Sequence, residues 1–228
     1  DLVPGRLGLF TNASLGALVT DLIGPVRIED APVPLAITAS NIETGERVVL
    51  REGPVALAVR ASACLPGLYA PVEIDGGRFV DGGLLDNVPV GPLRDDGAEV
   101  VVGVSLMADV PYSRVRSLPE VLVNAASFAL RESTRLELAG RADVVIEPDL
   151  TGRASWSLDD LPGVLAAGRC ATEAAVPAIR RALRQGARRT TAPAPAFARG
   201  LADHLRTDTG GGALAALQAG PVQCGAGG

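Results

Sequence analysis

The stretch FVDGGLLDNVP, Phe79 to Pro89, places one carboxylate, Asp81, at the end of an apolar run and follows it with two glycines. An aspartate in this setting caps a turn, accepts a proton or holds a metal ion. The turn is the ordinary role, because an aspartate side chain accepts a hydrogen bond from the backbone two residues further on. The residues that the chain brings to Asp81 decide between these roles.

The sequence before Asp81 predicts two hairpins and two helices. The runs PVEI and RFV flank Asp75-Gly76-Gly77, which is a strong hairpin signal. The runs PLAITASNI and RVVL flank residues 43–46 in the same way. Helices are expected over residues 12–23 and over PVALAVRASAC from about Val55. One face of the first helix is expected to carry its apolar side chains, Leu15, Leu18, Val19 and Leu22.

After Asp81, strand and helix patterns alternate. The apolar run VVVGVSL, Val100 to Leu106, is typical of a strand buried on both faces in a parallel sheet. Ser117-Leu118-Pro119-Glu120 is a capping box that begins a helix reaching about Leu136. ADVVIEPDL predicts another buried strand, and a last helix is expected from Leu161 to about residue 184. This alternation predicts an α/β fold, a layered sheet with flanking helices.

Composition limits the organisation and the partners of the chain. Its 228 residues carry a net charge of −5 without a basic stripe, which argues against a nucleic-acid partner. Apolar runs stay shorter than the roughly 20 residues of a membrane-spanning helix. The odd, scattered cysteines favour a reducing cytoplasm. We expect a domain over residues 1–184 and a low-complexity, disordered tail over 185–228.

The roles of Asp81 as a metal ligand or a proton acceptor require specific neighbouring residues. Asp75, Asp81 and Asp86 do not match the spacing of a calcium loop. The lone histidine, His204, lies in the predicted tail, so a Ser-His-Asp triad has no imidazole. Hydrolysis would therefore require Asp81 to act directly on a serine hydroxyl as general base. Gly82 and Gly83 would let a substrate or a facing backbone approach, and burial would raise the pKa of Asp81.

The segment AVRASACLPGLYAPVEIDGGRFVDGGLLDNVPV, residues 58–90, resembles the bacterial patatin-like phospholipases, including the branch related to neuropathy target esterase. NIETGERVVLREG and ADVVIEPDL are similar to those enzymes too, so the resemblance covers about residues 7–184. It implies a patatin-like fold and a lipid acyl hydrolase with a Ser-Asp dyad, in which Asp81-Gly82-Gly83 is the aspartate motif. It further implies a lipid ester substrate, no metal or nucleotide cofactor, and transient contact of a cytoplasmic protein with the membrane surface.

The same resemblance implies a part that the sequence does not contain. The family's serine lies in a G-x-S-x-G elbow after a glycine-rich oxyanion loop, both N-terminal to the residues present here. Ser14, Ser62 and Ser105 lack that context, so we expect the chain alone to be inactive and to be the C-terminal part of the domain. The absence of an initiator methionine favours a longer natural polypeptide.

Two further alternatives remain open from the sequence. The chain could be a non-catalytic patatin-like module that binds lipid or protein, or a regulatory partner attached to other domains. The apolar residues before the second hairpin could line an acyl-chain entrance or pack beneath their loop, namely Leu65, Leu68, Tyr69 and Ala70.

Overall fold

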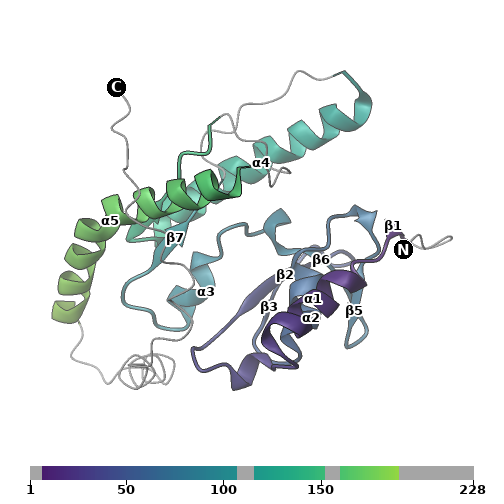
Figure 1. The fold of residues 1–228 in the computed structure, drawn as a ribbon, viewed down its shortest axis with the longest axis horizontal. Coiled ribbons are helices and arrows are strands. Elements are labelled where there is room, and N and C mark those ends of the chain that lie inside the picture. Colours follow the sequence, from purple (N-terminus) through teal and green to yellow (C-terminus); the bar gives the residue numbers. More distant parts are fainter. Residues whose placement is uncertain (1–6, 107–115, 152–159, 190–228) are drawn as a thin grey trace. The chain divides into compact units, whose positions relative to one another are not determined.

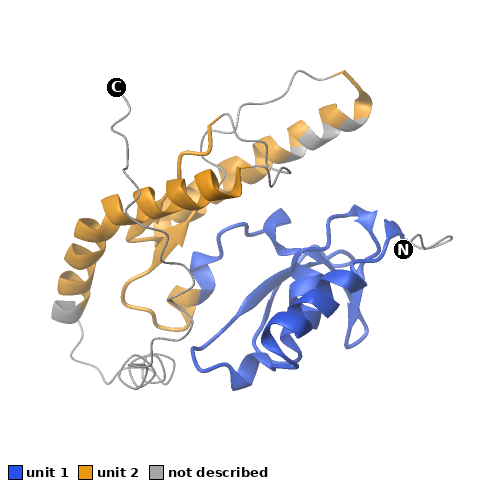
Figure 2. Cartoon of the chain, viewed as in Figure 1, with its two compact units in different colours: residues 1–92, 196–204 blue, residues 93–195, 205–228 orange. Residues whose placement is uncertain are grey.

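The computed structural model describes residues 7–106, 116–151 and 160–189 (Figure 1). These residues belong to two compact units (Figure 2), of which the first ends at Pro92 and the second begins at Leu93. Both units combine helices with short strands, which confirms the predicted α/β class. Within these ranges, every helix is too short or too polar to cross a membrane.

The first unit is built on a four-stranded antiparallel sheet in the order β3-β2-β6-β5. Both predicted hairpins are confirmed: β2 pairs with β3, and β5 pairs with β6. Asp75 and Gly76 join β5 to β6 with φ values of 49° and 81°, the left-handed backbone that this kind of turn requires. The bounds of the strands are Ile37–Asn41 for β2, Arg47–Leu50 for β3, Val72–Ile74 for β5 and Gly77–Asp81 for β6.

Two helices cover this sheet in successive layers. The helix α2 (Val55–Ser62) packs on β2 and β6, and α1 (Ala13–Ile23) packs on α2. A short 3-10 turn, η1 (Ile28–Asp30), leads from α1 toward the sheet. Small and β-branched side chains fill the space between α2 and the sheet, and the core that results consists of Ala39, Ala61, Cys64, Val72, Phe79 and Val80.

The predicted apolar face of α1 is right for Leu15 and Val19, which are half-buried, and wrong for Leu18 and Leu22. Leu18 and Leu22 are 53% and 74% exposed, whereas Gly16 is buried. The helix meets α2 through Gly16, whose missing Cβ would lie 2.5 Å from Cδ of Arg60, so the close contact selects the small residue rather than the leucines. The Asn12 side chain also bonds Arg60 instead of capping α1.

Two short strands fall where the sequence predicted none. β1 (Gly8–Phe10) and β4 (Gly67–Tyr69) form a parallel pair, with Gly8 opposite Gly67. The residues of β4 were expected to be loop. Three residues are too few to establish a period of two, and the glycines and Pro66 beside them indicate a turn.

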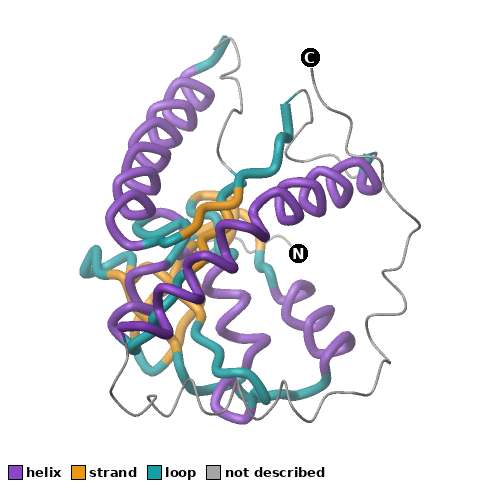
Figure 3. The backbone as a smooth tube through the Cα atoms, turned by 90° about the vertical axis from the view of Figure 1, so that its left-hand side faces the viewer, coloured by secondary structure: helices purple, strands orange, loops and turns teal. Residues whose placement is uncertain are grey.

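The second unit joins two parallel strands to long helices, as the colouring by secondary structure shows (Figure 3). β7 (Val102–Val104) pairs with β8 (Val144–Ile146), and α5 packs on β8. Val104 is 51% exposed while Gly103 is buried, so the prediction that this strand is buried on both faces is wrong. The long helices are α4 (Leu118–Arg141) and α5 (Leu161–Arg189), and the boundary between the units falls within the short helix α3 (Val90–Asp95).

The helices of the second unit extend further than the sequence predicted. α4 begins at the expected capping box, where Oγ of Ser117 accepts from the Glu120 N–H, but it ends at Arg141 rather than near Leu136. α5 ends at Arg189, past the expected beginning of the tail. The remainder of that predicted tail, residues 190–228, lies outside the described residues.

Candidate active site

Asp81 is the last residue of β6, and its backbone is held from two sides. Its N–H donates to the carbonyl oxygen of Cys64 at 2.9 Å, just beyond the end of α2. Its carbonyl oxygen accepts from Oγ of Ser40 on β2, also at 2.9 Å, and its Cα lies opposite Ala39. The sheet and the segment after α2 therefore fix where the carboxylate begins.

The carboxylate of Asp81 caps a short turn with one oxygen only. The Gly83 N–H donates to Oδ1 at 2.8 Å, at the beginning of the 3-10 turn η2 (Gly82–Leu84). This is the ordinary turn role that the sequence indicated. Among the described residues, none donates a hydrogen bond to Oδ2. The turn therefore orients the carboxylate and leaves its second oxygen available to accept a proton.

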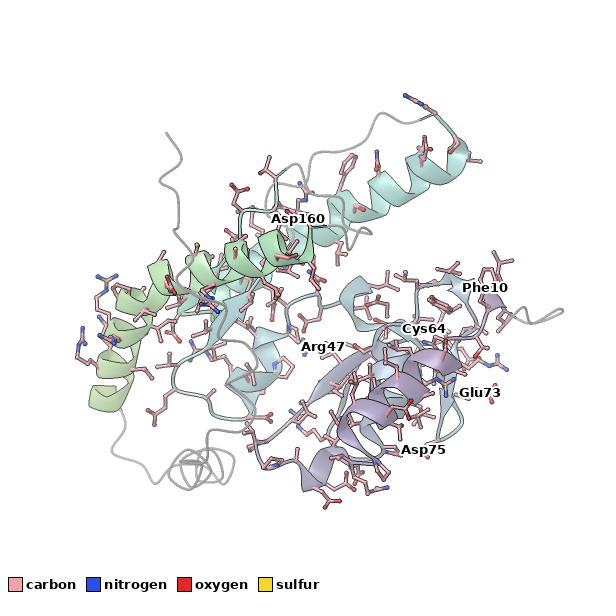
Figure 4. The ribbon with its side chains drawn as sticks, viewed as in Figure 1. Phe10, Arg47, Cys64, Glu73, Asp75 and Asp160 are labelled. Carbon is pink, nitrogen blue, oxygen red and sulfur yellow. The ribbon has the colours of Figure 1, made fainter. Side chains whose placement is uncertain are left out.

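The electrostatic surroundings keep Asp81 a better base than a free aspartate. Burial raises the pKa of Asp81 above its ordinary value, and the hydrogen bond from Gly83 opposes part of that rise. The pKa of the Cys64 thiol is raised as well, first by burial and also by the negative charge of Asp81. Figure 4 labels Cys64 in the segment that follows α2. The carboxylate and the thiol are thus neighbours.

The two glycines after Asp81 meet different neighbours. A Cβ on Gly82 would lie 2.3 Å from the carbonyl oxygen of Thr38, a backbone atom of the facing segment. A Cβ on Gly83 would lie 3.0 Å from Oδ1 of Asp81 and 3.1 Å from Oδ1 of Asn87, both side-chain atoms. Close approach of a facing backbone therefore concerns Gly82, whereas Gly83 leaves room around the carboxylate itself.

The other two aspartates of the possible metal site, Asp75 and Asp86, have surroundings different from those of Asp81. Asp75 is exposed in the β5–β6 turn, and Asp86 is buried in an ion pair with Arg47. Across residues 7–106, 116–151 and 160–189, acidic, histidine and cysteine side chains form no cluster of three that could hold a metal ion. This part of the chain offers no ligand set for a metal.

The three candidate serines lie in ordinary structural positions. Ser14 is exposed in the first turn of α1, and Ser62 is the last residue of α2. Ser105 is buried in the second unit, where its N–H donates to the carbonyl oxygen of Ile146. In the described part of the chain, no serine hydroxyl donates to the carboxylate of Asp81.

Two of the four apolar residues before the second hairpin divide between the two alternatives, while Leu65 and Ala70 are half-buried. Tyr69 packs against the core of the first unit, and Leu68 is 37% exposed on β4. Packing beneath the loop thus holds for Tyr69, while Leu68 keeps a surface that could meet an acyl chain.

Sequence reasoning missed three residues on neighbouring strands that lie around Asp81 and the turn after it. Ser40 and Thr38 lie on β2, and Arg47 lies at the beginning of β3. They belong to the first hairpin, which the sequence located but did not pair with β6. The signal that could have found them is the small polar pattern of ITASN in an otherwise apolar strand, because buried hydroxyls require partners.

Comparisons with known proteins identify the same region. The family model described as patatin-like phospholipase matches residues 1–94. An NTE family protein of Mycobacterium tuberculosis is 41% identical over 88 residues, which cover 39% of this chain and 24% of that protein. A second NTE family protein of the same species is 30% identical over 186 residues, which cover 71% of this chain and 32% of that protein.

A relative with a named activity matches a shorter part. Lysophospholipase NTE1 of Cryptococcus neoformans var. neoformans is 38% identical over 79 residues, which cover 35% of this chain and 5% of that protein. In each of these three relatives the matched stretch spans 32% of the length or less. The family model includes the whole β5–β6 hairpin and the turn after it. Through these matches, residues 1–94 are assigned to the patatin-like phospholipase family, and the chain is similar to NTE family proteins.

Proposed function

We propose that this chain supplies the aspartate of a Ser-Asp dyad in a lipid acyl hydrolase that acts on phospholipid or lysophospholipid esters. Asp81 is the general base. The serine and the oxyanion loop would belong to a longer polypeptide, a proposal supported by the greater length of the matched relatives. The lysophospholipase activity named for the Cryptococcus relative supports the substrate class.

The observation that carries the proposal is that the two oxygens of the Asp81 carboxylate have different hydrogen-bond surroundings. Oδ1 of Asp81 is fixed by the Gly83 N–H, and Oδ2 has no hydrogen-bond donor among the described residues. A base must accept a proton in a defined direction, and the oxygen that has no other hydrogen bond is the more accessible of the two for this step. Burial, which raises the pKa of Asp81, makes the carboxylate a stronger proton acceptor.

In the proposed reaction, Asp81 accepts the proton of the serine hydroxyl while the serine oxygen attacks the ester carbonyl. The protonated Asp81 then gives that proton to the leaving alcohol, and the acyl group remains on the serine. Asp81 then takes a proton from a water molecule that attacks the acyl ester, and it returns this proton to the serine oxygen as the carboxylic acid leaves, which restores the enzyme. No metal or nucleotide takes part in these steps.

The test is Asp81→Asn in the complete open reading frame that encodes this segment. Asparagine keeps the size and the hydrogen bond from Gly83 but cannot accept the serine proton. We expect the rate of hydrolysis of a short-chain aryl ester and of a lysophospholipid to fall by about 10²–10⁴-fold, with the fold retained. Melting curves of both proteins check the fold.

The matched control is Asp75→Asn, at the exposed turn of the same hairpin. It makes the same chemical change and should leave hydrolysis unchanged. Full activity of a folded Asp81→Asn variant would reduce Asp81 to a turn residue. Absence of hydrolysis in the wild-type protein would favour a module that binds without turnover.

A further inference from the structure

An ion pair between a buried carboxylate and a partly exposed guanidinium lies next to the turn that Asp81 begins. The guanidinium of Arg47, at the beginning of β3, donates to Oδ2 of Asp86, whose side chain is only 4% exposed. Figure 4 labels Arg47 on its strand. Oδ1 of Asp86 is buried and has no hydrogen-bond partner among the described residues. Asp86 is thus a buried charge held by a single cation.

Stability alone is a weak explanation for such a pair. Removing the Asp86 carboxylate from water offsets much of its attraction to the partly exposed Arg47, and apolar side chains of similar volume often stabilise a fold as well. An unpartnered buried carboxylate oxygen adds a further cost. The contacts that the Arg47–Asp86 pair makes with the turn are therefore a better guide to its role than stability.

The pair closes a ring of contacts around Asp81. Asp86 ends the turn that Asp81 begins, and its N–H donates to the carbonyl oxygen of Gly82 at 3.0 Å. Arg47 pairs across the sheet with Ser40, and Oγ of Ser40 donates to the carbonyl oxygen of Asp81. The two ends of the turn are therefore tied to the same hairpin, one through Ser40 and the other through the ion pair.

We infer that the Arg47–Asp86 ion pair positions the catalytic carboxylate by holding the η2 turn against the β2–β3 hairpin, so that the Gly83 N–H stays on Oδ1 of Asp81. This inference rests on the proposed function. Arg47 and Asp86 are positioning residues, because they act through the turn. Without the pair the turn relaxes, the Gly83 hydrogen bond weakens, and the carboxylate loses its fixed direction.

The inference has a pH signature with a definite sign. The Gly83 N–H stabilises the ionised form of Asp81 and lowers its pKa, so weakening this bond raises the pKa further. The base must be ionised, and the acid limb of the pH–rate profile therefore moves to higher pH. The other groups that bear on this titration are the Cys64 thiol, which senses the charge of Asp81, and Arg60, whose charge acts on Cys64. Thr38 and Ser40 on β2 are neutral.

The deciding variant is the double substitution Arg47→Met/Asp86→Leu. It removes one positive and one negative charge together, so the net local charge near Asp81 is unchanged. It also avoids the buried unpaired carboxylate of Arg47→Met alone, a variant that is expected to unfold more easily. The control is Arg78→Met/Glu43→Gln, which removes an exposed ion pair of 3.0 Å that also connects β6 to the first hairpin.

Two measurements separate this inference from the proposed function. The first is the pKa of the Asp81 carboxyl, followed by NMR in this chain labelled with ¹³C-carboxyl aspartate. The second is ester hydrolysis by the complete protein as a function of pH. We expect the double variant to show a raised Asp81 pKa, a kcat lowered by about 10-fold to 100-fold, an acid limb at higher pH and a nearly unchanged KM. The control should match the wild type in all four.

An unchanged pKa of Asp81 and an unchanged kcat in a folded double variant would overturn the inference, since the pair would then serve packing only. A raised pKa in a protein whose wild type hydrolyses no ester would support the positioning of Asp81 and overturn its proposed catalytic use. A kcat loss without a change in the pKa or in the acid limb would place the effect elsewhere and also overturn the inference.

Discussion

Exchanging Gly82 for alanine should mainly lower stability, whereas exchanging the adjacent Gly83 should mainly lower activity. A Cβ on Gly82 would lie 2.3 Å from the oxygen and 2.7 Å from the carbon of the Thr38 carbonyl. To reach ordinary van der Waals contact at 3.4 Å, that carbonyl must retreat by about 1 Å. Retreat pulls β2 from β6 at the Ala39–Asp81 pair and weakens the Ser40 hydrogen bond.

These contacts set the size of the effect. Overpacking of this kind costs about 1–3 kcal/mol, and a weakened hydrogen bond adds about 1 kcal/mol. We expect Gly82→Ala to lower the free energy of unfolding by about 2–4 kcal/mol. At Gly83 the new Cβ meets only the side-chain oxygens of Asp81 and Asn87, at 3.0 and 3.1 Å. Side chains can rotate away, so we expect a loss below about 1 kcal/mol.

The loss of activity should be larger for Gly83→Ala than its small loss of stability would suggest. Gly83→Ala presses on the carboxylate itself, and a misplacement of that group by about 1 Å can cost 10²-fold in rate. The assays are urea denaturation of this chain and ester hydrolysis by the complete protein. The reduced entropy of the unfolded chain is the same for both changes and cancels in the comparison. Equal destabilisation by the two alanines, or a neutral Gly82→Ala, would refute the packing argument.

Two further predictions concern stability alone. Because burial raises the folded-state pKa of Asp81 above its ordinary value of 3.8, its contribution to stability is full below pH 3.8 and is lost as the pH rises through the folded pKa. The Asp81→Asn side chain cannot ionise, so the stability of this variant relative to the wild type should increase across that pH window and then level off. Denaturation at a series of pH values measures this difference. A difference that does not change with pH would contradict the burial of the charge. Deleting residues 190–228, which lack periodic apolar positions, should change the melting temperature of the chain by less than about 2 °C, and a larger drop in a thermal melt would show that they pack on the folded part.

The sequence predicted the elements whose signals are local. Asp75-Gly76 between two apolar runs determined the β5–β6 hairpin, because few residues adopt the left-handed backbone that such a turn requires. The capping box at Ser117 located the beginning of α4 in the same way. The predictions failed where contacts between distant segments determine the structure. The close fit of Gly16 against Arg60 leaves Leu18 and Leu22 exposed, and no pattern within α1 carries that information.

In the candidate site too, some features follow from the local sequence and others from contacts between distant segments. Its place at the end of a strand and its bond to Gly83 follow from the local sequence DGG, which alone describes a turn. What distinguishes it from a turn aspartate comes from elsewhere in the chain. Ser40 and the Arg47–Asp86 pair hold both ends of the turn, and burial raises the pKa of the carboxylate. A turn needs only one oxygen of Asp81 and no such support. The supported geometry, with the second oxygen unengaged, is what a general base requires and what capping a turn does not.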